Sequence, residues 1–169
     1  MAHDILSFDP STLLVRDVCG SYRIAEPDEV LQAAQRLLID KLQGREVLSS
    51  PKAVRDFLRV KLGALEHEVF AVLMLDSQNR LIEYVELFRG TVSQASVYPR
   101  EVVKEALRHN AAAMILVHNH PSGVADPSRA DEHLTQNLKA ALQLVDVRVL
   151  DHLVVAGVET VSFAERGLL

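Results

Sequence analysis

The sequence places two histidines, His118 and His120, directly after a short run of apolar residues. On an extended backbone, side chains two positions apart project to the same side, so the two imidazoles face one region of space. Imidazole nitrogen and carboxylate oxygen bind zinc at about 2.0 to 2.2 Å, and catalytic zinc sites commonly use three protein ligands. Asp131 supplies the third ligand if the Pro- and Gly-containing loop after His120 folds back. The pattern therefore predicts a Zn²⁺ site made of His118, His120 and Asp131.

This ligand set favours a hydrolytic site over a structural one. Two neutral imidazoles and one carboxylate leave a zinc centre with a net charge of roughly +1, which lowers the pKa of a water molecule there toward about 7. Such a site needs a separate base, and Glu68 is the candidate because a carboxylate is otherwise out of place at the start of an apolar strand. Glu66 lies on the same face of an extended strand, so the pattern alone leaves both glutamates open. Ser128 is the candidate hydrogen-bond donor to the oxyanion that forms when water attacks a carbonyl.

Ser128 and Asp131 also fit a structural interpretation. Their spacing is that of a capping box, with Ser128 at the N-cap of a long helix and Asp131 three residues further on. Ser128 can cap the helix and still serve the site, whereas Asp131 must choose between the helix terminus and the metal. Asn119 and Ser122 are interpreted as loop formers, because Asn and Ser side chains hydrogen-bond the local backbone in turns.

The elements that must position these residues follow from the apolar pattern. Residues 1–26 show no sustained periodicity and are interpreted as an arm or as a segment that a partner covers. Two helices come next, each with apolar residues at helical spacing. The first starts at Pro27 and has Gly44 as its stop, and the second starts at Pro51, with its apolar stripe reaching Leu65.

The second half of the chain alternates between strand-like and helix-like segments. The apolar run 69–75, a turn-like Asp-Ser-Gln-Asn segment and the apolar-rich stretch 81–88 predict a hairpin. The further expected elements are a helix that opens at Tyr98-Pro99-Arg100, a strand at 112–117 covered on both faces, a long amphipathic helix with apolar residues from Leu134 to Val145, and strands at 147–156 and near Val161. This alternation through residues 51–163 predicts a layered α/β domain.

Other polar residues receive structural interpretations. Asp151 and His152 face opposite sides of their predicted strand, so they cannot act as a simple dyad, and a structural hydrogen bond at the end of the sheet is expected. His67 points away from Glu68 and is expected to be solvated. Arg100 and Lys104 lie one helical turn apart and could bind a substrate carboxylate, but a solvated helix face is the favoured interpretation.

Composition limits the class of protein. The chain has 169 residues, of which 49% are apolar and 24% charged, as in a folded domain rather than a disordered chain. The single cysteine, Cys19, cannot form a disulfide within the chain and suits a reducing compartment. The longest apolar run, Val69–Leu75, is far shorter than the roughly 20 residues that span a bilayer, and no basic segment followed by an apolar one opens the chain. These features predict a soluble, cytoplasmic protein.

The charge balance bears on partners. The chain has 18 Lys and Arg against 23 Asp and Glu, with a net charge of −5. This acidic balance does not favour nucleic acid as a partner. No pattern in the sequence indicates an oligomeric state.

At the candidate ligands the sequence resembles a known family. The spacing His118-x-His120-x7-Ser128-x2-Asp131, with a glutamate on an upstream strand, is similar to the signature of the JAMM (MPN+) metalloproteases. The string HNHPSG, with Tyr98-Pro99-Arg100-Glu101 before it and Val149-Leu150-Asp151-His152 after it, resembles the RadC branch of that superfamily. The resemblance covers about residues 50 to 169. It predicts a division into an N-terminal arm and helix at 1–50 and a RadC-like domain at 51–169.

The resemblance implies a cytidine-deaminase-like α/β fold with three layers around a central mixed sheet, preceded by N-terminal helices. It also implies zinc held by His118, His120 and Asp131, and hydrolysis of a peptide or isopeptide bond. A Glu-x-Phe-x-x-Leu run that begins at Glu68 favours this residue over Glu66 as the acid and base.

Two departures from the RadC pattern concern function and loop shape. RadC-like chains often carry a helix-hairpin-helix segment before this domain, and residues 1–50 show no glycine-bearing hairpin of that kind, which does not favour a direct role on DNA. The family loop commonly has an acidic residue followed by Pro soon after the Gly, whereas here Val124-Ala125-Asp126 precedes Pro127. The ligand positions are unaffected.

The sequence thus predicts a zinc-dependent hydrolase that cleaves an amide bond in a peptide or protein substrate. The alternative is an accessory protein associated with DNA repair, in which the metal site is structural or vestigial. A nucleobase deaminase shares the general fold type but needs His-x-Glu and Pro-Cys-x-x-Cys elements, which a chain with one cysteine cannot supply.

Overall fold

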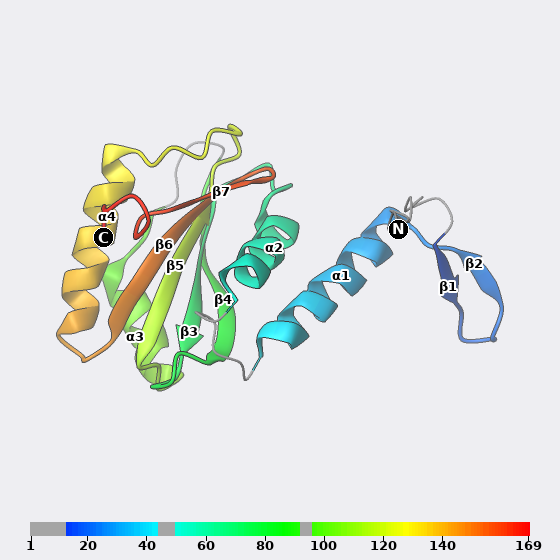
Figure 1. Cartoon of the computed structure of the whole chain (residues 1–169), viewed down its shortest axis with the longest axis horizontal. Helices are drawn as coiled ribbons and strands as arrows, with labels where there is room; N and C mark the ends of the chain where they lie inside the picture. Colours follow the sequence, from blue (N-terminus) through cyan, green and yellow to red (C-terminus); the bar gives the residue numbers. More distant parts are fainter. Residues whose placement is uncertain (1–12, 44–49, 92–95) are drawn as a thin grey trace, which may run out of the picture.

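The computed structural model describes residues 13–43, 50–91 and 96–169, and its centre is a five-stranded mixed sheet (Figure 1). The strand order is β4-β3-β5-β6-β7. The strands are β3 (Val69–Leu75), β4 (Leu81–Arg89), β5 (Ala113–Asn119), β6 (Arg148–Ala156) and β7 (Glu159–Ser162). β5 and β6 run parallel, whereas the other neighbouring pairs of this sheet are antiparallel. The predicted hairpin is the β3–β4 pair.

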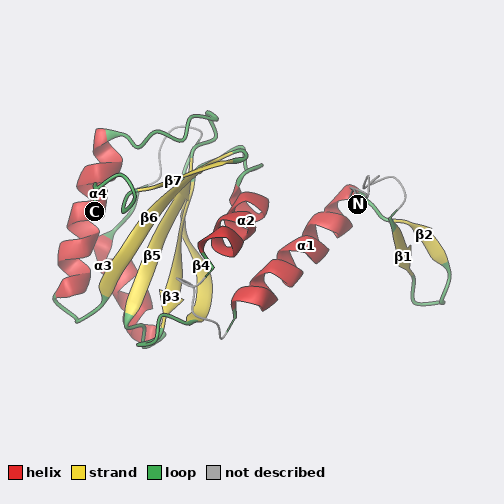
Figure 2. Cartoon of the chain, in the orientation of Figure 1, coloured by secondary structure: helices red, strands yellow, loops and turns green. Residues whose placement is uncertain are grey.

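Helices cover both faces of this sheet. The described residues form α1 (Pro27–Leu42), α2 (Pro51–Leu62), α3 (Pro99–Arg108) and α4 (Arg129–Gln143). α2 packs on one face and α3 and α4 pack on the other, while α1 lies against α2 on the outside (Figure 1, Figure 2). The chain therefore has the three-layered mixed α/β architecture that the alternation of elements predicted.

The two central strands are apolar on both sides because each side meets a helix layer. β3 is buried along its whole length, and so is β5. Since successive side chains of a strand point to opposite faces, alternate residues enter two separate cores. In β3 the set packed with α2 is Val69, Ala71, Leu73 and Leu75, and the set packed with α3 and α4 is Phe70, Val72 and Met74. Full burial of each Val, Leu, Phe or Met side chain stabilises the fold by about 1.5–3 kcal/mol, so both helix layers are anchored to the central strands.

The helix starts follow the local signals. α1, α2 and α3 each have proline in the first turn, where the missing N–H costs nothing. α2 ends at Leu62, before Leu65, which the apolar stripe had included. A side chain on Gly63 would collide with the backbone of Gly157, so the helix stops where it meets the β6–β7 turn. Leu65 still packs against the core from outside the helix.

Residues 1–26, which show no sustained periodicity in the sequence, contain two short strands in their described part. β1 (Leu14–Arg16) and β2 (Tyr22–Ile24) form an antiparallel hairpin, and the Asp17 carboxylate shapes its turn by accepting hydrogen bonds from the backbone N–H groups of Cys19 and Ser21. Strands of three residues are too short to show a period of two, so the pattern gave no signal. The hairpin lies at the end of α1 remote from the sheet (Figure 1). Residues 1–12 and the predicted stop at Gly44 lie outside the described residues.

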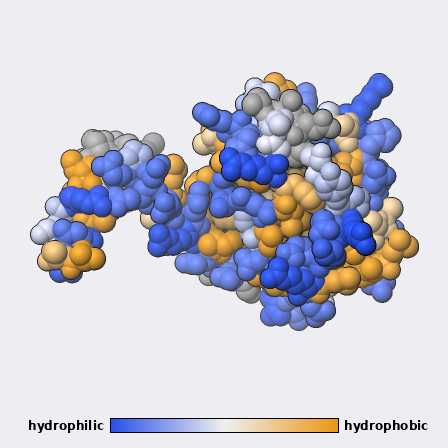
Figure 3. Space-filling model, turned by 180° about the vertical axis from the view of Figure 1, so that it is seen from behind, coloured by the Kyte–Doolittle hydropathy of each residue, from blue (hydrophilic) through white to orange (hydrophobic). Residues whose placement is uncertain are grey.

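The surface mixes polar and apolar side chains. In the space-filling view, apolar side chains gather on the N-terminal hairpin, where Leu14, Val18, Tyr22 and Ile24 are exposed (Figure 3). Within the ranges that the structure describes, no helix combines the length and apolar character needed to cross a membrane. The division of the chain at residue 50 stays a prediction.

Candidate metal centre

The three predicted ligands meet where β5 ends and α4 begins. His118 is the next-to-last residue of β5, His120 directly follows that strand, and Asp131 lies in the first turn of α4. The Nε2 atoms of His118 and His120 are 2.9 Å apart. Asp131 Oδ1 lies 3.4 Å from His118 Nε2, and Asp131 Oδ2 lies 3.6 Å from His120 Nε2. The fold therefore brings these side chains together as a possible metal-binding group.

The donor set fits a small divalent cation. Ligand atoms that each lie about 2.0–2.1 Å from a tetrahedral ion are about 3.3 Å apart, which is close to the distances of 2.9, 3.4 and 3.6 Å found here. Two imidazole lone pairs at the shortest of these distances repel each other unless a proton or a cation lies between them. The His118 side chain is 2% exposed, whereas those of His120 and Asp131 are 19% and 14% exposed, so the group opens to solvent on one side.

His120 is oriented by the loop that follows it. Its Nδ1 lies 2.7 Å from the carbonyl oxygen of Val124 and donates a hydrogen bond to it, which leaves Nε2 directed at the group. Gly123 has a φ of 81°, a conformation that L side chains rarely adopt, and this lets the loop turn back after His120. The carboxylate of Asp126 in this loop pairs with Arg166 near the end of the chain at 2.7 Å. The loop is thus held by contacts distant in sequence.

Asp131 is part of the helix cap of α4 and also faces the two histidines. Asp131 Oδ2 accepts hydrogen bonds from the backbone N–H and the hydroxyl of Ser128, at 2.7 and 2.6 Å, while the Asp131 N–H donates to Ser128 Oγ at 3.2 Å. This is the predicted capping box. Asp131 Oδ1 remains turned toward His118, so the geometry of the cap leaves this oxygen free to face a metal ion.

The electrostatics of the group centre on the Asp131 carboxylate. Burial by itself raises the pKa of Asp131, but hydrogen bonding with His118 and His120 outweighs burial and holds this pKa well below its usual range. In return, hydrogen bonding with Asp131 raises the pKa of His120. Asp131 is thus coupled to both imidazoles, and a metal ion bound here would take the place of these hydrogen bonds.

His118 is oriented from behind by His152. His118 Nδ1 lies 2.8 Å from His152 Nε2, and His152 Nδ1 lies 2.6 Å from the hydroxyl of Thr135. Burial lowers the pKa of His152 well below its usual value, so the ring is neutral. The sequence predicted a structural hydrogen bond here without naming a partner, and the structure shows that the His152 ring bonds to one of the candidate ligands. The available signal was a histidine followed by four apolar residues in the same strand.

Asp151 faces the other side of β6, as predicted. Its carboxylate accepts hydrogen bonds from the Ser162 hydroxyl at 2.6 Å and from the Ala164 N–H at 2.9 Å. These contacts tie β6 to the segment after β7. Asp151 thus has the structural role that the sequence suggested.

Glu68 lies one residue before β3 and is half-buried, whereas Glu66 is exposed. The Glu68 N–H donates to the carbonyl of Thr91, and its carbonyl accepts from the N–H of Gly90. The charge of Glu68 is among the causes that raise the pKa of His120, so the carboxylate lies within electrostatic reach of the group. Of the two candidate glutamates, Glu68 is the one with this relationship.

Asn119 is not the loop former that the sequence suggested. It is the last residue of β5, it is 2% exposed, and its side chain contacts β3 rather than the local backbone. Its Oδ1 accepts a hydrogen bond from the N–H of Val69 at 2.7 Å, and its Nδ2 donates to the carbonyl of His67 at 3.0 Å. These two backbone groups flank Glu68. Ser122, in contrast, bonds locally to the N–H of Val124, as predicted.

Comparison with known proteins places this geometry in a family. A family model described as the RadC-like JAB domain matches residues 48–168, which include both histidines, Asp131 and Glu68. The chain belongs to the RadC family. RadC-family relatives include a UPF0758 protein of Leptothrix cholodnii, 61% identical over 165 residues, which cover 98% of this chain and 74% of the relative. The UPF0758 proteins of Methylibium petroleiphilum and Nitrosomonas eutropha are 65% and 59% identical over 150 residues, covering 89% of this chain and 68% and 67% of those relatives. The name UPF0758 states no activity.

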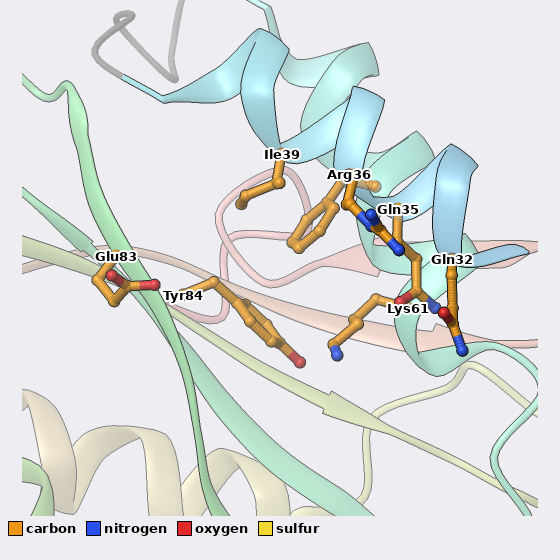
Figure 4. Close-up of a pocket in the computed structure, with 8 residues that line it drawn as sticks. Gln32, Gln35, Arg36, Ile39, Lys61, Glu83 and Tyr84 are labelled. Carbon is orange, nitrogen blue, oxygen red and sulfur yellow. The ribbon is translucent and has the colours of Figure 1, made fainter. Parts of the chain in front are cut away.

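One of the hollows of the described surface combines residues of α1 with residues of the RadC-like domain. It lies between α1, α2 and β4, has a volume of about 260 Å³, and contains Arg36, Lys61 and Tyr84 in its lining (Figure 4). Lys61 Nζ already pairs with Glu86 at 3.3 Å. None of the metal-centre side chains lines this hollow.

The predicted solvated face of α3 also stands. Lys104 pairs with Glu101 one turn earlier on its own helix, at 2.7 Å, and Arg100 is exposed. Neither Arg100 nor Lys104 belongs to the possible metal-binding group of two histidines and Asp131.

Proposed function

We propose that this RadC-family chain is a zinc-dependent hydrolase that cleaves amide bonds in peptide or protein substrates. The observation that carries the proposal is the convergence of His118 Nε2, His120 Nε2 and the Asp131 carboxylate at one partly solvent-open point, with Glu68 within electrostatic reach. Two imidazoles and one carboxylate form the ligand set of catalytic zinc sites that keep a position for water. Membership of a family with a JAB domain supports the same chemistry.

The residues of the chain would divide the work as follows. A zinc ion at this site would supply Lewis acidity and lower the pKa of a water molecule toward about 7. Glu68 would take a proton from the water that attacks the amide carbonyl and return it to the leaving amine. The C–N bond breaks, and one water molecule is consumed for each carboxylate and amine released. Asn119 would keep Glu68 in place through the two backbone bonds that flank it.

Ser128 would stabilise the developing oxyanion. Its hydroxyl now donates to Asp131 Oδ2 at 2.6 Å. Because a hydroxyl rotates, the same hydrogen can be given to an oxygen that develops negative charge beside Asp131. The Ser128 backbone N–H would continue to hold Asp131 Oδ2 while the hydroxyl turns.

Elemental analysis followed by a hydrolysis screen tests the proposal. The purified chain should contain about one zinc ion after loading. The zinc-loaded chain should then cleave members of a mixed library of peptides and isopeptide-linked peptides, and a chelator should stop the cleavage. Failure to take up zinc would overturn the proposal. Zinc uptake without cleavage, together with nucleic-acid binding that weakens steeply with salt, would favour the accessory role instead.

A further inference from the structure

His152 is a buried titratable side chain that the proposed reaction does not use. It is 0% exposed, yet both of its ring nitrogens have partners. Nε2 meets His118 Nδ1 at 2.8 Å, and Nδ1 meets Thr135 Oγ1 at 2.6 Å. Phe163 stacks on the ring at a centroid distance of 4.7 Å. Any aromatic residue could fill this space, so the two hydrogen bonds call for a separate explanation.

The single hydroxyl hydrogen of Thr135 sets the direction of these bonds. The carbonyl oxygen of Asp131, 2.6 Å from Thr135 Oγ1, can only accept, so Thr135 donates to it. Thr135 Oγ1 then accepts from His152 Nδ1, which carries the ring proton. His152 Nε2 has the lone pair and accepts from His118 Nδ1. His118 is therefore left with a lone pair on Nε2, the atom that faces His120 and Asp131.

This chain of bonds begins and ends at metal-ligand residues. It starts at the backbone carbonyl of Asp131 in α4, passes through Thr135 and through His152 in β6, and ends on His118 in β5. The three elements that carry the site are thus joined behind it. The bonds also select one of the two neutral forms of the His118 ring, the one that can bind a cation through Nε2.

We propose that His152 and Thr135 are positioning residues of the metal centre, which hold the His118 ring in the orientation and tautomer that present the Nε2 lone pair to the ion. The inference rests on the proposed function, since it assumes that the group binds zinc. Partners that donate or accept at the second nitrogen of a ligating histidine commonly affect metal affinity by about 10–100-fold. A ring that only fills the core would leave zinc affinity unchanged when it is replaced by another ring.

Zinc affinity of the full chain, measured by competition with a chromophoric chelator, tests the inference. His152→Phe keeps an aromatic ring against Phe163 but removes the acceptor for His118 Nδ1, so affinity should fall by about 10–100-fold. His152→Gln can still accept through its amide oxygen and should retain most of the affinity. The exposed His133 in α4 gives a control, because His133→Gln should not change zinc affinity.

Thr135 provides a second pair of variants, and these change the packing of the core less than the His152 variants do. Thr135→Val has nearly the same shape but no hydroxyl, and should weaken zinc binding by about 2–10-fold, the equivalent of one hydrogen bond. Thr135→Ser keeps the hydroxyl and should bind zinc like the unaltered chain. This pair decides the question if His152→Phe does not fold, as judged by circular dichroism of the zinc-free chain.

A measurement without metal tests the tautomer directly. Long-range ¹⁵N–¹H correlation spectra should show the His152 proton on Nδ1 and the His118 proton on Nδ1. A His152 proton on Nε2 would overturn the inference, and so would equal zinc affinities in folded His152→Phe, Thr135→Val and unaltered chains. Absence of zinc binding by the unaltered chain would overturn the proposed function, and it is distinguishable because the spectra need no metal.

Discussion

Asn119 Oδ1 accepts a hydrogen bond from the backbone N–H of Val69 at 2.7 Å, one residue beyond the point where the β3–β5 ladder ends. The last paired residues of that ladder are Phe70 and His118, and His120 already pairs with β6 through the carbonyl of Val155. β5 thus leaves β3 at Asn119, and the side-chain amide takes the place of the missing backbone partner. The same amide binds the carbonyl of His67, so the backbone on both sides of Glu68 is held.

Replacement of Asn119 should therefore destabilise the fold and disturb Glu68 without removing the metal. Asn119→Ala leaves the Val69 N–H and the His67 carbonyl without this partner, at a cost of about 1–3 kcal/mol for each buried group. We expect a lower free energy of unfolding by urea titration, retained zinc, and slower hydrolysis. Ser122→Ala, on the exposed loop, should change stability by less than about 0.5 kcal/mol. Equal free energies of unfolding for the two variants would show that the two Asn119 hydrogen bonds do not stabilise the fold.

Removal of the metal should lower thermal stability, because a ligand that binds the folded chain shifts the unfolding equilibrium. At a free zinc concentration of 100 times its dissociation constant, the stabilisation is about 2.7 kcal/mol. For a chain of this size, that corresponds to an increase in Tm of about 5–10 °C, which a chelator should reverse. Differential scanning calorimetry at several zinc concentrations measures the shift. A Tm that does not respond to zinc or chelator would contradict a site formed by the folded chain.

Substitution of Asp131 can separate its role in the capping box from its proposed role in zinc binding. The amide oxygen of an asparagine can still accept the hydrogen bonds from Ser128, so Asp131→Asn should preserve much of the capping box while weakening zinc binding through the loss of charge. Asp131→Ala also removes the acceptor for the Ser128 N–H and hydroxyl, which should cost about 0.5–1.5 kcal/mol for each lost hydrogen bond, while the bond from the backbone N–H of residue 131 to Ser128 Oγ remains. Zinc content by elemental analysis and stability by urea unfolding give the two readouts. If both variants bind zinc as the unaltered chain does, Asp131 is only a cap.

The purified protein should need His120 to take up zinc. His120→Ala removes a ligand at the solvent-open side of the group, where the side chain is 19% exposed, so the fold should survive while zinc is lost from the purified protein. His133→Ala is the matched control, since His133 is exposed on α4. Full zinc occupancy in His120→Ala would remove this residue from the ligand set.

Substitution of the candidate base should slow hydrolysis without removing zinc, unlike substitution of a metal ligand. Glu68→Gln keeps the size of the side chain but cannot take up a proton, so it should retain zinc and lose hydrolysis, by about 10²–10⁴-fold. Glu66→Gln alters the exposed neighbour and should affect neither property. Turnover by Glu68→Gln at the rate of the unaltered chain would assign the base to another residue.

Much of the architecture could be predicted because its causes are local. Proline in the first turn marks three helices, apolar runs mark β3 and β5, and Ser128 with Asp131 marks the start of α4. The expected convergence of two histidines and an aspartate follows from the period of a strand and from the loop that returns to the helix. The β1–β2 hairpin was missed because its strands are too short to carry a pattern.

The sequence by itself determined the mixed α/β class, the order of most elements and the set of candidate ligands, since these depend on periodicity and on residues close together in the chain. Only the tertiary structure decided that the Asn119 side chain spans from β5 to β3 and that the His152 ring lies against Nδ1 of His118. These relationships depend on the register between strands and on which face each side chain takes, and interactions across the whole sheet set that register.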